Sequence, residues 1–252
     1  MKYKNFDPQV WTKIKVALKE EIARCQSLQV RPVAAFDADG TLWDTDLGEG
    51  FFQYQIQKNL LPGLPPNPWR HYRDMKESGD PRPAYLWLAQ INKGLHLTQI
   101  QKWARDYLQS LHPLPLFAAQ QDLIQLLHDN QVDIYIVTAS IKWSVEPGAQ
   151  LYNIPSENVL GVRTKVENGI ITETQEGEIT YREGKFHALL TATGGRKPFL
   201  CAGNTFGDIA LLDGATKISL AVGATKPGNE LFQAEEKLRA EAFKRNWIVH
   251  EF

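Results

Sequence analysis

Two carboxylates one residue apart, Asp37 and Asp39, directly follow a short apolar run, Val33–Phe36. The run predicts a buried strand, and open α/β sheets bind their ligands at the carboxyl ends of strands. Alternate residues of an extended chain face the same side, so the two carboxylates are expected to converge. Such a pair repels unless a cation lies between its members. The stretch predicts a reactive, cation-dependent site, against the alternative of a solvated strand end followed by a glycine turn.

More polar residues follow other predicted strands or open predicted helices, namely Thr138, Ser140, Lys185, Asn204 and Asp208. Right-handed crossovers bring such ends to one edge of a parallel sheet. Together with the two carboxylates they include a nucleophile, a proton donor, hydroxyls, an ammonium group and oxygen ligands for a hard cation such as Mg²⁺. This set of groups suits chemistry on a phosphate.

The elements that must position these residues alternate between strands and helices, which indicates an α/β fold with a Rossmann-like, doubly wound parallel sheet. An amphipathic helix is predicted over residues 7–28, with Asp7 and Pro8 at its start. Asn168-Gly169 predicts a hairpin turn. Strands are predicted at 33–36, 132–137, 158–162, 198–202, 217–222 and 247–249, and helices at 117–130, 145–152, 184–190, 209–212 and 229–245.

Residues 44–115 carry helical patterns and no strand pattern. Helices are predicted at 47–60, 84–91 and 98–111, and the proline-rich run 61–68 predicts a loop. A helical block between two strands is typical of an inserted cap. We therefore predict a core domain of residues 1–43 and 116–252 and an all-helical cap domain of residues 44–115.

The composition is that of an ordinary globular chain: 252 residues, 43% hydrophobic, 23% charged, with a net charge of −1. This charge gives no reason to expect nucleic acid or a membrane as a partner. Two cysteines and six histidines show neither disulfide nor metal spacing. No signal peptide or membrane span is evident, so we expect a cytoplasmic location. We expect the protein to be a monomer or a homodimer.

Four stretches in order resemble the haloacid dehalogenase (HAD) superfamily, specifically its phosphoserine-phosphatase-like branch with a helical C1 cap. Asp37-Ala-Asp-Gly-Thr41 matches the first motif, which is highly specific after a strand. The second and third motifs match Ile134–Ser140 and Gly184-Lys185, each weak alone, and the fourth matches Ala202–Asp208 in form. The resemblance covers almost all of the chain after residue 31.

The resemblance implies a Mg²⁺-dependent phosphatase acting on a small-molecule phosphomonoester. Asp37 would form an aspartyl-phosphate and Asp39 would transfer protons. Lys185 would neutralise the charge near Asp37. Thr138 is the fourth implied catalytic residue and would hold the transferring phosphoryl group. The implied substrate-binding residues beside it are Thr41, Ala139 and Ser140. The implied metal ligands are Asp37, Asp39, Asn204 and Asp208.

One residue departs from the family pattern. The fourth motif usually begins Gly-Asp, whereas this chain has Gly203-Asn204. An amide oxygen ligates Mg²⁺ without bringing a negative charge, so we predict weaker metal binding than in a relative with aspartate there. The same departure leaves open a catalytically weak pseudo-phosphatase that acts as a binding protein.

The second carboxylate separates the enzyme classes of this superfamily. A halide leaves without being protonated, so Asp39 favours phosphate esters over halides as substrates. A phosphotransferase or phosphomutase, which differs only in the acceptor that attacks the intermediate, remains an alternative.

Segments around Glu49, Tyr85 and Trp87 resemble sequences of the phosphorylcholine-phosphatase type. Their aromatic rings would suit a quaternary ammonium through cation–π attraction, with Glu49 or Asp80 adding negative charge. The alternative is that Tyr85 and Trp87 fill the core of the cap. Those relatives are usually exported.

Overall fold

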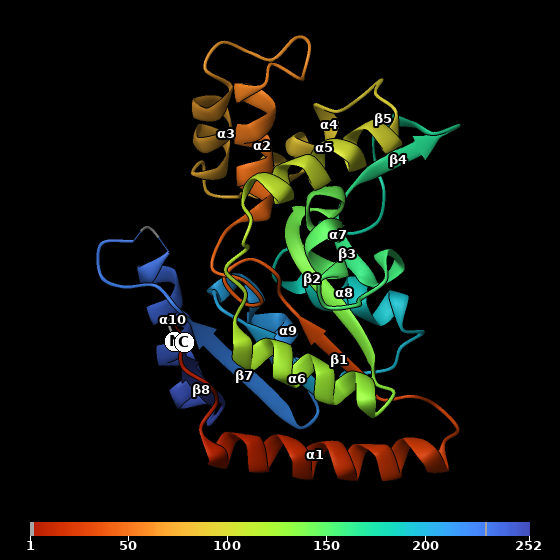
Figure 1. The fold of residues 1–252 in the computed structure, drawn as a ribbon, viewed down its shortest axis with the longest axis vertical. Helices are drawn as coiled ribbons and strands as arrows, with labels where there is room; N and C mark the ends of the chain where they lie inside the picture. The colour runs from red at the N-terminus through yellow and green to blue at the C-terminus, as the bar shows by residue number, and fades with distance from the viewer. Residues whose placement is uncertain (1–2, 230) are drawn as a thin grey trace. The chain divides into compact units, whose positions relative to one another are not determined.

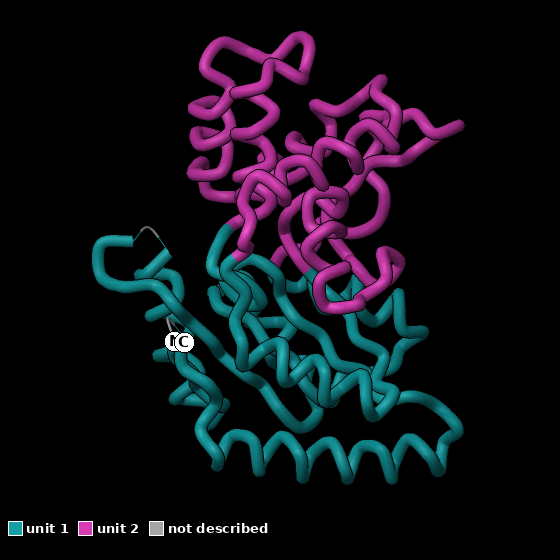
Figure 2. Tube along the Cα trace, in the orientation of Figure 1, with its two compact units in different colours: residues 1–45, 115–137, 182–252 teal, residues 46–114, 138–181 magenta. Residues whose placement is uncertain are grey.

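The computed structural model describes residues 3–229 and 231–252, and the chain forms two compact units (Figures 1 and 2). Unit 1 contains Met1–Thr45, Pro115–Val137 and Arg182–Phe252, drawn in teal in Figure 2. Unit 2 contains Asp46–Leu114 and Thr138–Tyr181, drawn in magenta. Each is described below by itself.

The main sheet has six strands in the order β3-β2-β1-β6-β7-β8. Their bounds are β1 Val33–Phe36, β2 Asp133–Ile141, β3 Val159–Val162, β6 Leu200–Gly203, β7 Ile218–Gly223 and β8 Ile248–Glu251. Strand β1 pairs in parallel with β2 on one side and with β6 on the other. The strand order reverses at β1, which is where open α/β sheets bind ligands. The predicted parallel α/β sheet is confirmed.

Burial explains why β1 is short and apolar. All four of its residues are buried, and a strand covered on both faces reads as a continuous hydrophobic run. The helices of unit 1 are α1 Pro8–Ser27, α6 Ala118–Asp129, α8 Glu183–Ala192, α9 Ile209–Asp213 and α10 Phe232–Lys244. Helix α1 begins as predicted, since the Asp7 side chain accepts a hydrogen bond from the Gln9 amide and Pro8 opens the first turn.

Unit 2 contains the predicted hairpin as well as helices. Its elements are α2 Leu47–Gln57, α3 Pro68–Lys76, α4 Arg82–Gln90, α5 Leu97–Ser110, α7 Lys142–Gln150, the short 3₁₀ helix η1 Ser156–Asn158, and the strands β4 Thr164–Glu167 and β5 Ile170–Gln175. Strand β3 and the end of β2, from Thr138 on, also belong to this unit. Asn168 and Gly169 both have positive φ, which a tight two-residue hairpin turn requires.

The boundary between the units differs from the predicted one. Residues 138–181 were predicted to lie in the core domain, but they group with residues 46–114. The β4–β5 hairpin explains part of this difference, because it hydrogen-bonds to the turn between α4 and α5. The Gly94 amide donates to the Ile171 carbonyl at 2.8 Å, and the Leu97 amide donates to the Gly169 carbonyl at 2.9 Å.

Helix α3 was not predicted. Tyr72 is its buried residue, and the helix is nine residues long and mostly polar, so it is shorter than the window of about 11–18 residues in which an amphipathic pattern is recognised. Two ion pairs at i,i+4 spacing support it instead, Arg70 with Asp74 and Arg73 with Glu77. Pro68 provides its first turn.

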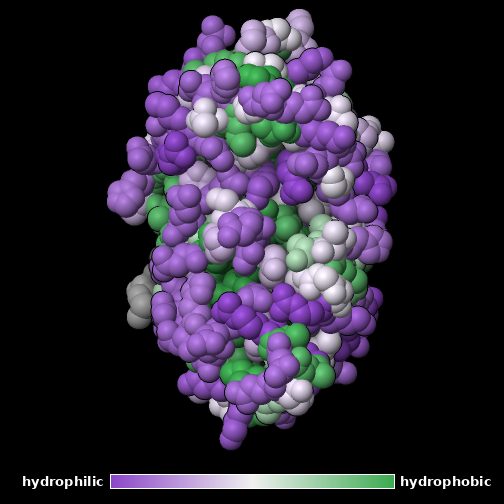
Figure 3. Space-filling model, turned by 90° about the vertical axis from the view of Figure 1, so that its right-hand side faces the viewer, coloured by the Kyte–Doolittle hydropathy of each residue, from purple (hydrophilic) through white to green (hydrophobic). Residues whose placement is uncertain are grey.

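Hydrophilic side chains cover most of the face seen in Figure 3, with apolar ones in separate patches between them. Across the described residues, no helix combines the length and the apolar character needed to cross a membrane.

Candidate active site

Asp37 is the first residue after β1 and is buried. Its amide continues the sheet pattern by donating to the Ala202 carbonyl of β6 at 2.9 Å. One carboxylate oxygen, Oδ2, accepts a hydrogen bond from the buried Thr41 hydroxyl at 3.0 Å. The other, Oδ1, lies 2.6 Å from Lys185 Nζ. The end of β1 therefore holds one carboxylate in a defined orientation between a hydroxyl and an ammonium group.

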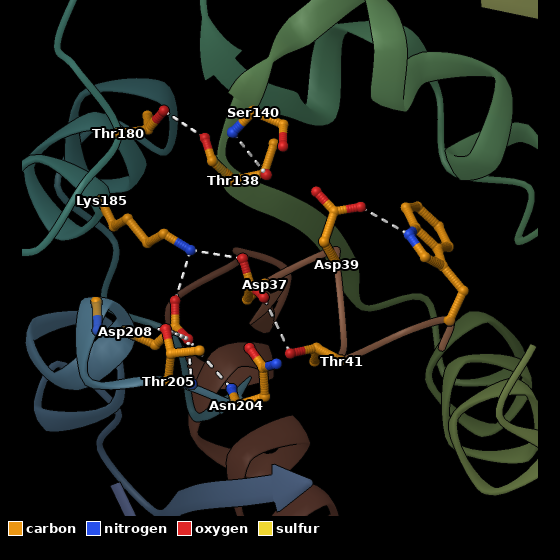
Figure 4. Close-up of polar contacts among 12 residues, drawn as sticks. Asp37, Asp39, Thr41, Thr138, Ser140, Thr180, Lys185, Asn204, Thr205 and Asp208 are labelled. Carbon is orange, nitrogen blue, oxygen red and sulfur yellow. Dashed lines mark hydrogen bonds and ion pairs between the residues drawn. The ribbon is translucent and has the colours of Figure 1, made fainter. Parts of the chain in front are cut away.

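Lys185 enters this site from the first turn of α8 (Figure 4). Its side chain is only 3% exposed, and its ammonium group contacts Asp37 Oδ1 at 2.6 Å and Asp208 Oδ1 at 2.5 Å. A buried lysine needs such partners, since removing a charge from water is costly. Two carboxylates from distant parts of the sequence thus share one ammonium group.

Asp208 is held by a turn that the sequence pattern encodes. Thr205 and Asp208 form a capping box at the 3₁₀ helix η2 Phe206–Asp208. Asp208 Oδ2 accepts hydrogen bonds from the amides of Asn204 at 3.1 Å and Thr205 at 2.9 Å. A Cβ on Gly203 would lie 2.5 Å from the Asp208 Cβ, so this turn needs glycine there.

The charges in this buried cluster shift the pKa of two of its members. Burial, reinforced by the negative charge of Asp208, raises the pKa of Asp37 to about 7 despite the opposing effect of Lys185. Burial alone would lower the pKa of Lys185, but the nearby Asp208 and Asp37 outweigh it and raise that pKa. Lys185 stays protonated, while Asp37 ionises near neutral pH.

Asp39 has a different partner. Its Oδ1 accepts a hydrogen bond from the indole N–H of Trp43 at 2.8 Å, which orients the carboxyl group. The chain between them turns tightly, with the Gly40 amide donating to the Trp43 carbonyl at 2.9 Å. Asp37 and Asp39 therefore sit in different environments, one against an ammonium group and the other against an indole.

Gly40 and Asn204 meet at the centre of the site. Gly40 has φ +75°, and a Cβ there would lie 2.1 Å from Asn204 Nδ2. The Asn204 side chain is 2% exposed, and its Nδ2 finds no hydrogen-bond partner in residues 3–229 and 231–252. A buried amide left without a partner is unusual and points to a ligand atom at this place.

Gly40→Ala is expected to destabilise the protein by about 2–4 kcal/mol, because alanine is strained at positive φ and its methyl group would collide with Asn204. Urea denaturation would measure the change. Gly63→Ala is the matched control, since Gly63 also has positive φ (+72°) but open space around it. Equal losses in the two variants would show that strain alone, without the collision, explains the effect.

The last three residues of the predicted second motif, Thr138, Ala139 and Ser140, belong to unit 2. Thr138 is buried on β2, and its carbonyl accepts a hydrogen bond from the Thr180 hydroxyl. Its Oγ1 accepts from the Ser140 amide at 3.1 Å, so the threonine side chain holds the backbone near the end of β2. A Cβ on Gly48 would lie 2.3 Å from Ser140 Oγ, which explains the glycine at the start of α2.

The predicted cap residues have partners of their own in unit 2. Glu49 Oε1 accepts a hydrogen bond from the Tyr72 hydroxyl at 2.9 Å and forms an ion pair with Lys76. Tyr85 packs edge-on against Tyr181 at 5.6 Å between ring centres. Trp87 packs edge-on against Phe52 and His71. Trp87 therefore belongs to an aromatic cluster of unit 2 and is half-buried there.

Trp43 and Thr205 were not recognised as parts of the site from the sequence, nor was Lys76 as the partner of Glu49. The spacing of Thr205 and Asp208 is a capping-box signal, which would have identified the role of Thr205 from the sequence. No local signal links Trp43 to Asp39 or Lys76 to Glu49, because these contacts arise from a turn and from the unpredicted helix α3.

Comparison with protein families gives the decisive observation. The model of the haloacid dehalogenase-like hydrolase family matches residues 34–213. The chain belongs to this family. The match begins in β1 and ends with α9, and therefore spans Asp37, Lys185 and Asp208.

Relatives of this HAD-family chain are distant. It is 24% identical over 191 residues to a phosphorylcholine phosphatase of Pseudomonas aeruginosa. The aligned region covers 61% of this chain and only 55% of that protein. A conserved, functionally unknown protein from Anaerococcus prevotii shares the fold, with a TM-score of 0.71, 16% identity and coverage of 98% of this chain and 93% of that one. A structure described as a phospho-aspartyl intermediate analogue of phosphoserine phosphatase has a TM-score of 0.53 at 14% identity, covering 88% and 93% of the two chains.

Proposed function

We propose that this HAD-family protein is a phosphatase that hydrolyses a small-molecule phosphomonoester through an aspartyl-phosphate. The observation that carries the proposal is the buried Asp37, held between Thr41 and Lys185 at the end of β1. A carboxylate fixed at a sheet's carboxyl edge beside an ammonium group suits nucleophilic attack on an anionic phosphoryl group. The relatives that are phosphatases by name support the same class.

The proposed reaction has two steps. In the first, an Asp37 carboxylate oxygen bonds to phosphorus, the ester P–O bond breaks, and Asp39 gives its proton to the departing alcohol oxygen. In the second, Asp39 takes a proton from water, the water oxygen bonds to phosphorus, and the bond from Asp37 breaks to release phosphate. Lys185 offsets negative charge in both steps. Thr138, Ala139 and Ser140 are proposed to bind phosphoryl oxygens through the hydroxyl groups and backbone amides.

The residues of the site fit a hard divalent cation. Asp37 offers a carboxylate, the buried Asn204 the oxygen of its side-chain amide, and Asp39 a backbone carbonyl. When bound, Mg²⁺ would neutralise phosphoryl oxygens and hold the ester against Asp37. Asp208 was predicted as a ligand, but its Oδ1 contacts Lys185 and its Oδ2 accepts two amides. We therefore propose that Asp208 positions Lys185.

Phosphate release from a panel of phosphomonoesters, with and without Mg²⁺, tests the proposal. Turnover that needs Mg²⁺ is expected for at least one small ester. Transfer of the phosphoryl group to an added alcohol in preference to water would favour the phosphotransferase alternative. Metal binding with no turnover on any ester would favour the binding-protein alternative.

Asn204→Asp is expected to lower the Mg²⁺ concentration needed for half-maximal activity by roughly tenfold, because it adds a negative charge at the proposed cation site. Mg²⁺ titration of phosphate release measures this. Asn153→Asp, outside the site, is the matched control for the added charge. Equal activation constants in Asn204→Asp and the native protein would contradict a role for Asn204 as a ligand.

A further inference from the structure

Three helices of unit 2 bring together one carboxylate, one ammonium group and two phenol rings. Glu49 comes from α2, Tyr72 and Lys76 from α3, and Tyr85 from α4. Lys76 Nζ forms an ion pair with Glu49 and lies 5.8 Å from the ring centre of Tyr72 and 6.0 Å from that of Tyr85. We call these four residues the Lys76 cluster.

Two aromatic rings and a carboxylate around a cation are the components of an organic-ammonium site. Here the cation is supplied by the chain itself. Tyr72 is fully buried, and its hydroxyl donates to the same Glu49 oxygen at 2.9 Å, which holds the carboxylate in place. Lys76 remains 31% exposed and Glu49 19% exposed, so small molecules in solution can reach the cluster.

We propose that Lys76 occupies an ammonium-binding site of the cap and thereby excludes external quaternary ammonium groups. A trimethylammonium group has no N–H and cannot replace the hydrogen bonds that Lys76 donates to Glu49. It must also compete with a tethered cation, whose effective concentration is on the order of millimolar or above. Lys76 is thus a specificity-determining residue.

The inference rests on the proposed phosphatase function and narrows it, because it excludes phosphate esters of quaternary amino alcohols from the substrates of the native chain. The sequence comparison alone would favour them, since one relative is a phosphorylcholine phosphatase by name. The difference depends on the cation at position 76, in helix α3.

Equilibrium binding of tetramethylammonium to the full chain tests the inference directly. Lys76→Met keeps an unbranched apolar stem against the two tyrosines and removes the charge. Calorimetric titration is expected to show at least tenfold tighter binding to Lys76→Met than to the native protein, and loss of that gain in Lys76→Met/Glu49→Gln. Lys93→Met removes the lysine of another ion pair of unit 2, with Glu173, and is expected to bind like the native protein.

Equal binding by the native protein and Lys76→Met, including no detectable binding by either, would overturn the inference. A second readout uses two esters of the same shape, phosphorylcholine and its uncharged isostere 3,3-dimethylbutyl phosphate. Lys76→Met is expected to raise kcat/KM for phosphorylcholine relative to the isostere at least tenfold. An unchanged ratio would oppose a role in specificity. Failure of every variant on both esters would count against the phosphatase function, whereas the tetramethylammonium titration would still decide the role of Lys76.

Discussion

Asp37→Asn is expected to reduce phosphate release on the order of 10⁴-fold or more, because an amide cannot attack phosphorus as a carboxylate does. The substitution keeps the shape of the side chain and its contact with Thr41. It also removes a buried charge that repels Asp208, whose influence helps to raise the pKa of Asp37 to about 7. The variant should therefore fold at least as stably as the native protein at pH 8.

Steady-state phosphate release and urea denaturation, measured on the same preparations, separate chemistry from folding. Asp122→Asn changes an exposed aspartate of α6 and is expected to keep full activity. Asp39→Asn should retain more of the first step with an ester whose leaving group is a weak base, because such a group departs without a proton. Native-level turnover by Asp37→Asn would overturn the assignment of the nucleophile.

Much of unit 1 could be predicted because its local signals agree with its fold. A four-residue apolar run ending in Asp37 indicated a buried strand, and that strand lies at the point where the sheet order reverses. Strand–helix alternation indicated the parallel sheet, and in unit 2 Asn168-Gly169 indicated the hairpin. Each of these features depends on residues that are close together in the sequence.

Contacts between residues that are far apart in the sequence could not be predicted from it as well. The sequence indicated Lys185 and Asp208 as site residues, but not that one ammonium group would lie between two carboxylates. Asp208 was taken for a metal ligand because carboxylates at such positions often are. Its oxygens are engaged by Lys185 and by the amides of its own turn, and only the folded chain shows that.

The helices of the cap show a second limit of prediction from the sequence. Helix α3 has nine residues, most of them polar, and is supported by ion pairs and a proline start, so it was too short to be recognised by periodicity. Because α3 was not predicted, Lys76 was not recognised as a partner of Glu49. Glu49 was therefore expected to offer its negative charge to an external ammonium group. In the structure, Glu49 forms an ion pair with Lys76 of this helix. The domain boundary differed for a related reason, since the hairpin after β3 hydrogen-bonds to a turn some 75 residues earlier in the chain.

Lys185→Met is expected to destabilise the protein by about 3–5 kcal/mol at pH 8.5, because it leaves the buried carboxylates of Asp37 and Asp208 without their cation. Activity should also fall by about 10²–10³-fold, the usual effect of removing one group that stabilises transition-state charge. Lys217→Met, which breaks an ion pair with the exposed Glu20, is the matched control and should cost at most about 1 kcal/mol.

The pH dependence of this loss distinguishes an electrostatic cause from a packing defect. The pKa of Asp37 in the folded protein is raised to about 7, so the folded state holds a proton more readily than the unfolded state, and stability falls as pH rises through 7. Lys185 opposes that shift, and its removal raises the pKa further. The deficit of Lys185→Met should therefore shrink by about 1–2 kcal/mol between pH 8.5 and pH 6, where a protonated Asp37 no longer needs a cation. Urea denaturation at both pH values measures the change, and a deficit that stays constant would indicate lost packing instead of two carboxylates left without their shared ammonium group.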